Sequence, residues 1–318
     1  NRRLMSTLSP SAAQLPRPLP RPLPRLRIVL LSLLFVGLYW LLRALPDAQC
    51  GFLHYEEVVN ADGTVEFCAT NHAGFLDLTR LKYPVEVELA MPQPASPGEP
   101  HEVTLQLSTS GGMPIAPHEL AVTHTKKMHV MLIDPALMDY HHVHPQAVGL
   151  NGEYRFEFTP QRAAEYQVFV EIVPLRTRRQ VIATGTLTVG APAEPAMAFE
   201  RRPTCVVDDV RFELTELPAK LRTGVDYRLG LKVSAADGSA VELQQVMGAQ
   251  GHMVAFDADG KGFAHMHPFD SVLSERSNSE QPGLAFLFNV PNPGWYRIFA
   301  QVQVNGREVF GHFDLAVE

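Results

Sequence analysis

The chain has 318 residues, enough for two domains, and its 46% hydrophobic and 19% charged residues are typical of a globular protein. Acidic residues outnumber basic ones by 34 to 27, and seven arginines precede the first acid, Asp47, which leaves 20 basic against 34 acidic residues beyond it. This acidic balance argues against nucleic acid as a partner, because binding to phosphates requires a basic face.

The N-terminal segments predict a membrane anchor. Residues 1–27 form a Pro/Arg-rich tail whose repeat LPRPLPRPLPR favours an extended conformation. Residues 28–45 begin with an uncharged apolar run and carry Tyr39 and Trp40 where interfacial aromatic residues are expected, so we predict a single transmembrane helix. A cleaved signal peptide is the alternative. The arginines on its N-terminal side place the tail in the cytoplasm, and we expect a single-pass protein of the bacterial inner membrane with periplasmic C-terminal domains.

Residues 46–83 form a lead-in to the first domain and contain two of the three cysteines. Cys50 and Cys68 could close a loop in an oxidising compartment. Cys205 is then left over, and we interpret it as a small buried hydrophobic residue. The pairing of the three cysteines stays open at this point.

Short alternating apolar segments, separated by turn signals, follow in residues 84–190 and return in the same order in residues 204–318. The Pro/Ala-rich stretch at 191–203 separates them and is interpreted as a linker. Strands at this spacing are typical of sandwiches. The sequence therefore predicts an all-β fold, with two tandem Ig-like β-sandwich domains after a single N-terminal transmembrane helix, that arose by internal duplication.

A histidine motif carries the clearest signal of duplication. HVMLIDPALMDYHHVHP, residues 129–145, aligns without a gap on HMVAFDADGKGFAHMHP, residues 252–268. The two copies share the first histidine, an aspartate five residues later and a closing His-x-His-Pro. The DADGKG stretch predicts a tight β-hairpin in which Asp257 pairs with Gly262.

This register places the histidines of each copy on one face. His252 lies opposite His267, and His265 shares their face because strand side chains alternate. In the first copy, Asp134 pairs with Asp139, and the gathered residues are His129, His142 and His144, with Met131 facing His142. Neutral imidazole is a common donor to transition metals, and three such donors leave an open position. We predict one metal site in each hairpin, with copper as first choice and zinc as the alternative metal.

Two further residues are candidate fourth ligands. His124 and Met247 each stand five residues before the first histidine of their copy. A thioether ligand would favour Cu(I) at the second site. Most other methionines nearby are interpreted as core residues.

A structural role is the competing interpretation of the histidines. The same strand faces carry Ile133 and Phe256, so the histidines could end a core and bond to Asp134, to Asp257 or to backbone groups. Gene duplication would copy such a motif as readily as a metal site.

The hairpin and the later strand containing Gly294-Trp295-Tyr296-Arg297, matched by Ala164-Glu165-Tyr166-Gln167, resemble bacterial exported YtkA-like and CopC-like domains across residues 84–318. The resemblance implies CopC-like β-sandwiches and copper handling. The chain departs from the CopC pattern because it has no histidine at a mature N-terminus and no methionine-rich loop. The identity and oxidation state of the metal therefore stay open.

These observations favour a non-enzymatic protein that buffers, senses or delivers copper, with a metal-acceptor protein as partner. The alternative is an accessory or interaction subunit of a membrane protein complex that binds no metal. A copper oxidoreductase ranks last, since no general acid or substrate-binding motif accompanies the histidines.

Overall fold

The computed structural model describes residues 25–44, 55–59, 65–69, 75–78, 83–192, 197–268 and 284–318. Helix α1 spans Arg25–Ala44 and belongs to a different unit of the chain from the two repeats. Among the described residues, no helix is both long and apolar enough to cross a membrane. The anchor expected at residues 28–45 stays a prediction from the sequence.

The first repeat forms two four-stranded antiparallel sheets around a shared apolar core. One sheet has the order β4-β5-β9-β8, with β4 at Val85–Ala90, β5 at His101–Thr109, β9 at Glu153–Phe158 and β8 at Gln146–Ala147. The other has the order β11-β10-β6-β7, with β11 at Val181–Val189, β10 at Ala164–Ile172, β6 at Met128–Ile133 and β7 at Tyr140–Val143. A short 3-10 turn, η1, spans Pro117–Glu119. Alternating residues such as Val103 and Leu105 point into the core, so the expected sandwich forms.

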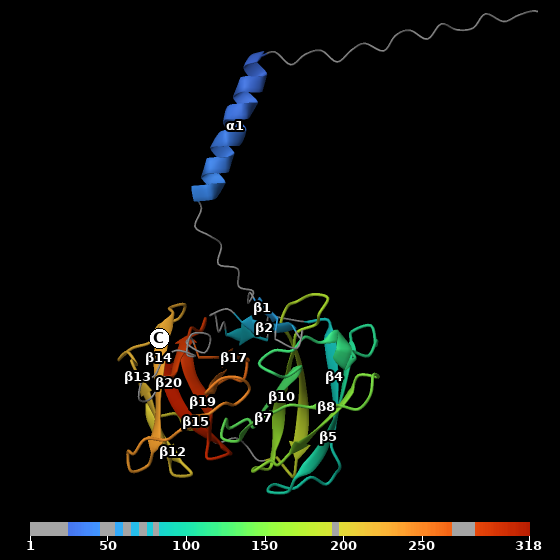
Figure 1. Ribbon diagram of the computed structural model, residues 1–318, viewed down its shortest axis with the longest axis vertical. Coiled ribbons are helices and arrows are strands. Elements are labelled where there is room, and N and C mark those ends of the chain that lie inside the picture. The colour runs from blue at the N-terminus through green and yellow to red at the C-terminus, as the bar shows by residue number, and fades with distance from the viewer. Residues whose placement is uncertain are drawn as a thin grey trace, which may run out of the picture. The chain divides into compact units, whose positions relative to one another are not determined.

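The second repeat keeps the strand order of the first except at the edges of its sheets, which confirms the duplication. Its first sheet is β12-β13-β14-β18, with β12 at Thr204–Val207, β13 at Val210–Thr215, β14 at Tyr227–Ala235 and β18 at Leu284–Phe288. Its second sheet contains β15 at Leu243–Gln244, β16 at His252–Asp257, β17 at Gly262–Met266, β19 at Gly294–Val304 and β20 at Arg307–Val317. The order β20-β19-β16-β17 matches β11-β10-β6-β7. Figure 1 shows β7 and β10 in the green part of the first repeat and β19 and β20 in the red part of the second. Cys205 is a free, half-buried thiol packed against this repeat's core.

Both histidine hairpins adopt the predicted register. In the second, Met253 lies opposite Met266, which aligns Asp257 with Gly262. In the first, Met131 lies opposite His142, as predicted. A tight turn sets this register, and an aspartate side chain closes it in each copy.

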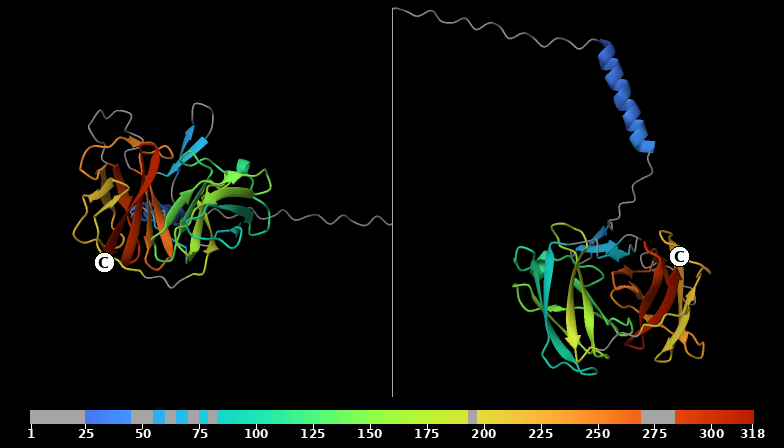
Figure 2. Two further views of the ribbon diagram at one scale, coloured as in Figure 1. Left: turned by 90° about the horizontal axis from the view of Figure 1, so that it is seen from below. Right: turned by 180° about the vertical axis from the view of Figure 1, so that it is seen from behind.

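The hairpin sheets of the two sandwiches face each other. Every residue of β6 and of β16 is buried, so both faces of each strand are covered. Val130 and Leu132 point into the core of the first sandwich, and alternation turns His129, Met131 and Ile133 the other way. There a third core joins the two repeats, with Met131, Ile133, Tyr140 and Phe169 from the first and Val254, Phe256, Phe263 and Phe299 from the second. The two sandwiches accordingly lie side by side in both views of Figure 2.

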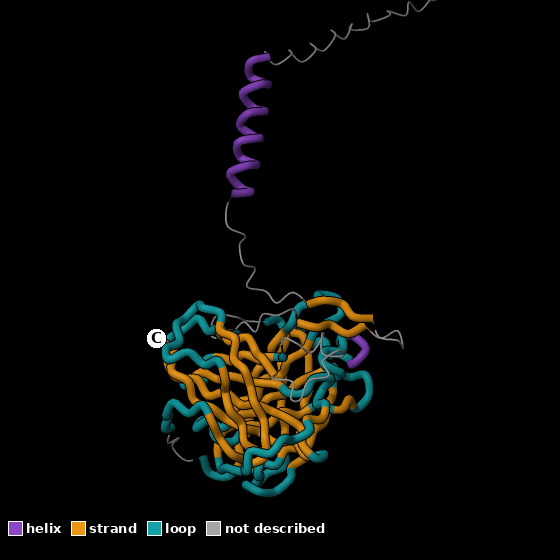
Figure 3. Tube along the Cα trace, turned by 60° about the vertical axis from the view of Figure 1, so that its left-hand side comes forward, coloured by secondary structure: helices purple, strands orange, loops and turns teal. Residues whose placement is uncertain are grey.

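A strand of the lead-in extends the second sandwich, although the chain next enters the first. The lead-in contains β1 at Tyr55–Val59, β2 at Val65–Ala69 and β3 at Leu76–Asp77. Leu76 and Asp77 of β3 pair with Phe263 and Gly262 of β17. A Cβ at Gly262 would lie 2.0 Å from the backbone oxygen of Leu76, so this close approach requires glycine. Strands dominate both sandwiches in Figure 3. The predicted pairing of Cys50 with Cys68 lies outside the residues whose side chains are described.

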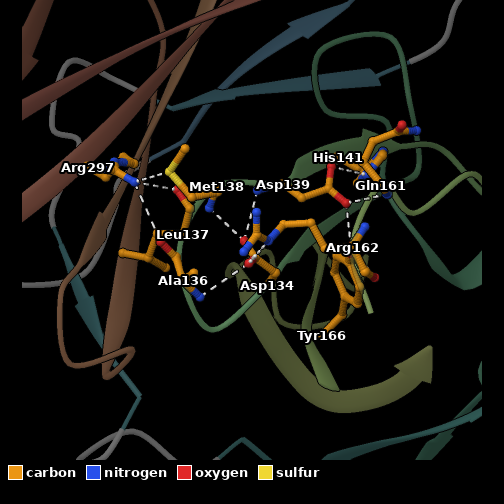
Figure 4. A network of polar contacts seen from close by, with 10 residues as sticks. All are labelled: Asp134, Ala136, Leu137, Met138, Asp139, His141, Gln161, Arg162, Tyr166 and Arg297. Carbon is orange, nitrogen blue, oxygen red and sulfur yellow. Dashed lines mark hydrogen bonds and ion pairs between the residues drawn. The ribbon is translucent and has the colours of Figure 1, made fainter. Parts of the chain in front are cut away.

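Arg297 connects the second sandwich to the hairpin turn of the first. Its side chain is 4% exposed and pairs with Asp314 through two contacts of 2.6 and 2.7 Å. It also donates to the backbone oxygen of Leu137 at 3.1 Å (Figure 4). In the same figure, Asp139 accepts from the hydroxyl of Tyr166 and lies 2.8 Å from Nε2 of His141. A polar network therefore fixes the turn that carries the first pair of aspartates.

Candidate metal centre

The first triad consists of His129 on β6, His142 on β7 and His144 directly after β7. Nδ1 of His129 lies 3.2 Å from Nε2 of His142 and 3.3 Å from Nε2 of His144. A metal ion bonded to imidazole nitrogens at about 2.0–2.1 Å holds two of them about 3.3–3.4 Å apart in a tetrahedral site. The two separations from Nδ1 of His129 are therefore close to the spacing that such an ion requires.

Hydrogen bonds on the far side of two rings turn bare nitrogens toward one another. His129 donates from Nε2 to the backbone oxygen of Thr123 at 2.9 Å, so Nδ1 of the neutral ring carries the lone pair. His142 donates from Nδ1 to Oε1 of Gln301 at 3.0 Å, so its Nε2 carries the lone pair. These two lone pairs face each other, an arrangement that a shared cation would stabilise.

The second triad repeats this donor set in the other sandwich. It consists of His252, His265 and His267, whose candidate ligand atoms lie within 4.8 Å of one another. His252 donates from Nε2 to the backbone oxygen of Val246 at 2.9 Å, as His129 does in the first copy. Nδ1 of His252 and Nε2 of His265 and His267 are buried and have no hydrogen-bond partner. Each unsatisfied buried polar atom costs about 1–3 kcal/mol, and one metal ion would satisfy all three.

Burial favours the neutral form of five triad histidines. Desolvation lowers the pKa of His129 to about 4 and that of His144 to about 3. Desolvation, followed by neighbouring histidines, also holds the pKa of His142, His252 and His267 well below the ordinary value. Rings that are neutral at physiological pH present the lone pairs that metal binding needs.

The two candidate fourth ligands lie in equivalent turns. His124 and Met247 both have positive φ, 48° and 51°, in two-residue turns closed by paired backbone hydrogen bonds. The ring of His124 stacks on His267 of the other sandwich, with centroids 3.6 Å apart, and lies 6.2 Å from His129. Burial lowers the pKa of His124 to about 3. The structure therefore brings His124 closer to the second triad than to its own, and it places Met247, also buried, in the matching turn.

The competing structural interpretation is correct in part. The histidine faces do continue into an apolar core, and His129 and His252 do bond to backbone oxygens. The aspartates, however, have another role: Oδ1 of Asp257 accepts from the backbone N–H groups of Lys261 and Gly262 at 2.7 and 3.0 Å. Asp134 likewise accepts from the N–H groups of Met138 and Asp139. The aspartates close the turns, while the histidines converge on one another.

Asp257→Ala is expected to lower the free energy of unfolding by about 1–3 kcal/mol, because two backbone N–H groups lose a charged acceptor. Thermal or urea unfolding measures this loss, and the number of metal ions bound should not change. Asp259→Ala is the control, since Asp259 pairs with Lys261 at the exposed surface and its loss should change stability little. Equal effects of the two variants would contradict the turn-closing role.

Two residues of the site were not identified from the sequence. Glu171 on β10 pairs in register with His129, and Gln301 on β19 is paired with His252. Glu171 stands five residues after Tyr166, and Gln301 stands five residues after the aligned Tyr296. A polar residue inside the otherwise apolar runs 168–172 and 298–302 is the signal that could have found them.

Comparison with known proteins identifies a family but no activity. A family model described as a domain of unknown function (DUF8832) matches residues 82–190 and again residues 205–318. No curated protein matches the chain. None of these findings bears on the YtkA-like and CopC-like resemblance, which stays a prediction.

Two solved structures are similar to the chain at low identity. The Escherichia coli adhesin FdeC is 16% identical, with a TM-score of 0.21, over 73% of this chain and 64% of that one. A DUF4785 family protein from Legionella pneumophila is 8% identical, with a TM-score of 0.25, over 74% of this chain and 57% of that one. The chain thus spans less than two thirds of either structure.

Proposed function

The chain belongs to the family of the domain of unknown function DUF8832, and we propose that its two copies of this domain hold transition-metal ions at two three-histidine sites. The observation that carries the proposal is the convergence of three imidazole nitrogens in each copy, as Nδ1, Nε2 and Nε2. In the second copy the three converging nitrogens are buried without a hydrogen-bond partner, and in the first copy the lone pairs of His129 and His142 face each other. A cation in each group would compensate the burial of these atoms.

Copper is the proposed metal, with zinc as the alternative. All-imidazole donor sets suit both metals, and divalent copper binds a given nitrogen site more tightly than zinc does. Three protein ligands leave a position through which an ion can be accepted or passed on. A protein that buffers, senses or delivers copper, with a metal-acceptor protein as partner, fits this arrangement better than an enzyme. Two CopC-like sandwiches, anchored in the inner membrane and facing the periplasm, belong to the same proposal.

Metal content tests the proposal. The full-length chain, purified without a histidine tag, is loaded with Cu(I), Cu(II) or Zn(II), washed and analysed by mass spectrometry. We expect two retained ions per chain in the wild type and none in His129→Ala/His252→Ala, because each substitution removes one member of a triad. His118→Ala, an exposed histidine outside the triads, is the control and should retain two ions.

A wild-type chain that retains no ion would overturn the proposal. The histidines would then be structural, and the accessory subunit of a membrane complex would become the better hypothesis. Retention that is equal in the wild type and the double variant would locate the metal elsewhere and would contradict these two sites.

A further inference from the structure

The two triads form one cluster across the interface between the sandwiches. The ring centroid of His265 lies 5.3 Å from that of His142 and 5.7 Å from that of His129. Centroids within the second triad are 4.5 to 5.8 Å apart, so the separation between triads is no larger than the separation inside one. The surroundings of each triad therefore include the other sandwich.

Gln301 orients a ligand of the first triad although it belongs to the second sandwich. Its Nε2 donates to Oε2 of Glu308 at 2.8 Å, and an ionised carboxylate only accepts. This contact fixes the amide, so that Oε1 faces His142 and accepts the Nδ1 proton. The lone pair on Nε2 of His142 is thereby directed toward His129 and His144.

Glu171 makes the reciprocal contact from the first sandwich. Its Oε2 lies 3.1 Å from Nδ1 of His265, and the two side chains are 6% and 2% exposed. Nε2 of His265, on the other side of the ring, is the buried atom without a partner.

The two contacts between the sandwiches, Glu171 with His265 and Gln301 with His142, follow the symmetry of the repeat. Glu171 and Gln301 occupy equivalent positions, each opposite the first histidine of its own hairpin, and each reaches the middle histidine of the other hairpin. The tight turns also meet, because a Cβ on Gly248 would lie 3.3 Å from Cγ2 of Thr125. Repetition of the contact in both directions makes an accidental contact a poor explanation.

We propose that Glu171 and Gln301 are positioning residues that complete, from the opposite sandwich, the metal sites of the second and first triads. This inference rests on the proposed metal binding and deepens it. Neither sandwich then carries a whole site. Partners that orient a metal-bound histidine typically contribute about 10–100-fold to metal affinity.

The experiment measures Co(II) binding by the full-length chain, because the visible absorption of Co(II) reports ligand geometry. His252→Ala/His267→Ala leaves the first triad alone, and Gln301→Met in that background should weaken Co(II) binding about 10–100-fold and shift its spectrum. Gln303→Met, two residues along the same strand, is the control and should change neither.

The second triad is measured in a His129→Ala/His144→Ala background. There Glu171→Met should weaken Co(II) binding about 10–100-fold, and Glu171→Gln, which keeps an acceptor of the same shape, should restore most of it. The conservative variant keeps the test decisive if Glu171→Met fails to fold. If Glu171→Gln weakened Co(II) binding as much as Glu171→Met does, the residue would contribute its charge rather than the orientation of His265. That result would overturn the proposal.

The outcomes separate this inference from the function on which it rests. A wild-type chain that binds no Co(II), Zn(II) or copper removes the metal function itself. Two bound ions in the wild type, with Gln301→Met and Glu171→Met each within twofold of their backgrounds, would leave the metal function standing and overturn the cross-sandwich positioning.

Discussion

Replacing Arg297 with methionine is expected to lower the free energy of unfolding by about 3–5 kcal/mol, because the substitution leaves Asp314 as an unpaired buried charge. The variant also loses the bonds from the guanidinium to the backbone oxygens of Leu137 and Ala198. Urea denaturation, followed by the fluorescence of Trp295, measures the change. Trp295 stacks on Phe199 at 5.8 Å and reports on the same region.

The double variant Arg297→Met/Asp314→Leu is the matched control. Removing both charges removes the uncompensated carboxylate, so most of the lost stability should return, apart from the share of the backbone contacts. A single variant within about 1 kcal/mol of the wild type would show that the pair is not buried in solution. If the double variant were as unstable as the single one, the lost free energy of unfolding would come from the contacts with Leu137 and Ala198.

Local signals in the sequence were sufficient for the hairpins. The turn DADGKG limits how its flanking strands can pair, and alternation then decides which side chains share a face. His252, His265 and His267 could therefore be grouped by counting alone. The first copy lacks the glycines, but the gapless alignment transferred the register to it correctly.

The packing of the two hairpins against each other could not be predicted in the same way. Pairing across an interface depends on the shapes of two surfaces, and Phe256 or Met131 would read as an ordinary core residue in either sandwich. One clue was present: β6 and β16 are apolar on both faces, which is unusual for a sandwich strand with one face in water. The prediction of one metal site in each hairpin did not use this clue, so the contact of Glu171 with His265 was not expected.

His124 is a single residue whose neighbours across the interface could not be predicted from the sequence. Its distance in sequence from His129 suggested a ligand for the same triad. Its positive φ in a tight turn, however, directs the ring across the interface to His267. Because Met247 occupies the matching turn, the duplication preserved the turn while the side chain changed.

Addition of metal is expected to stabilise the protein by about 4 kcal/mol per site when the free ion is present at a thousand times its dissociation constant. At about 2–4 °C per kcal/mol, each site would raise the unfolding midpoint by roughly 8–16 °C. Calorimetry of the full-length chain with and without Zn(II) or Cu(I) measures this rise. In the double variant His144→Gln/His267→Gln, which replaces one half-buried ligand of each triad, most of the rise should be lost.

The metal-free state of this variant separates a ligand from a structural histidine. A structural histidine stabilises the protein without metal, so its loss would lower the unfolding midpoint of the metal-free chain. A ligand is costly to bury when no ion is bound, because Nε2 of His267 has no partner, so the metal-free variant should unfold close to the wild type. Since the triads meet at the core that joins the sandwiches, we expect metal to raise one shared transition rather than the transition of one repeat. Two transitions, of which metal moves only one, would contradict a common centre.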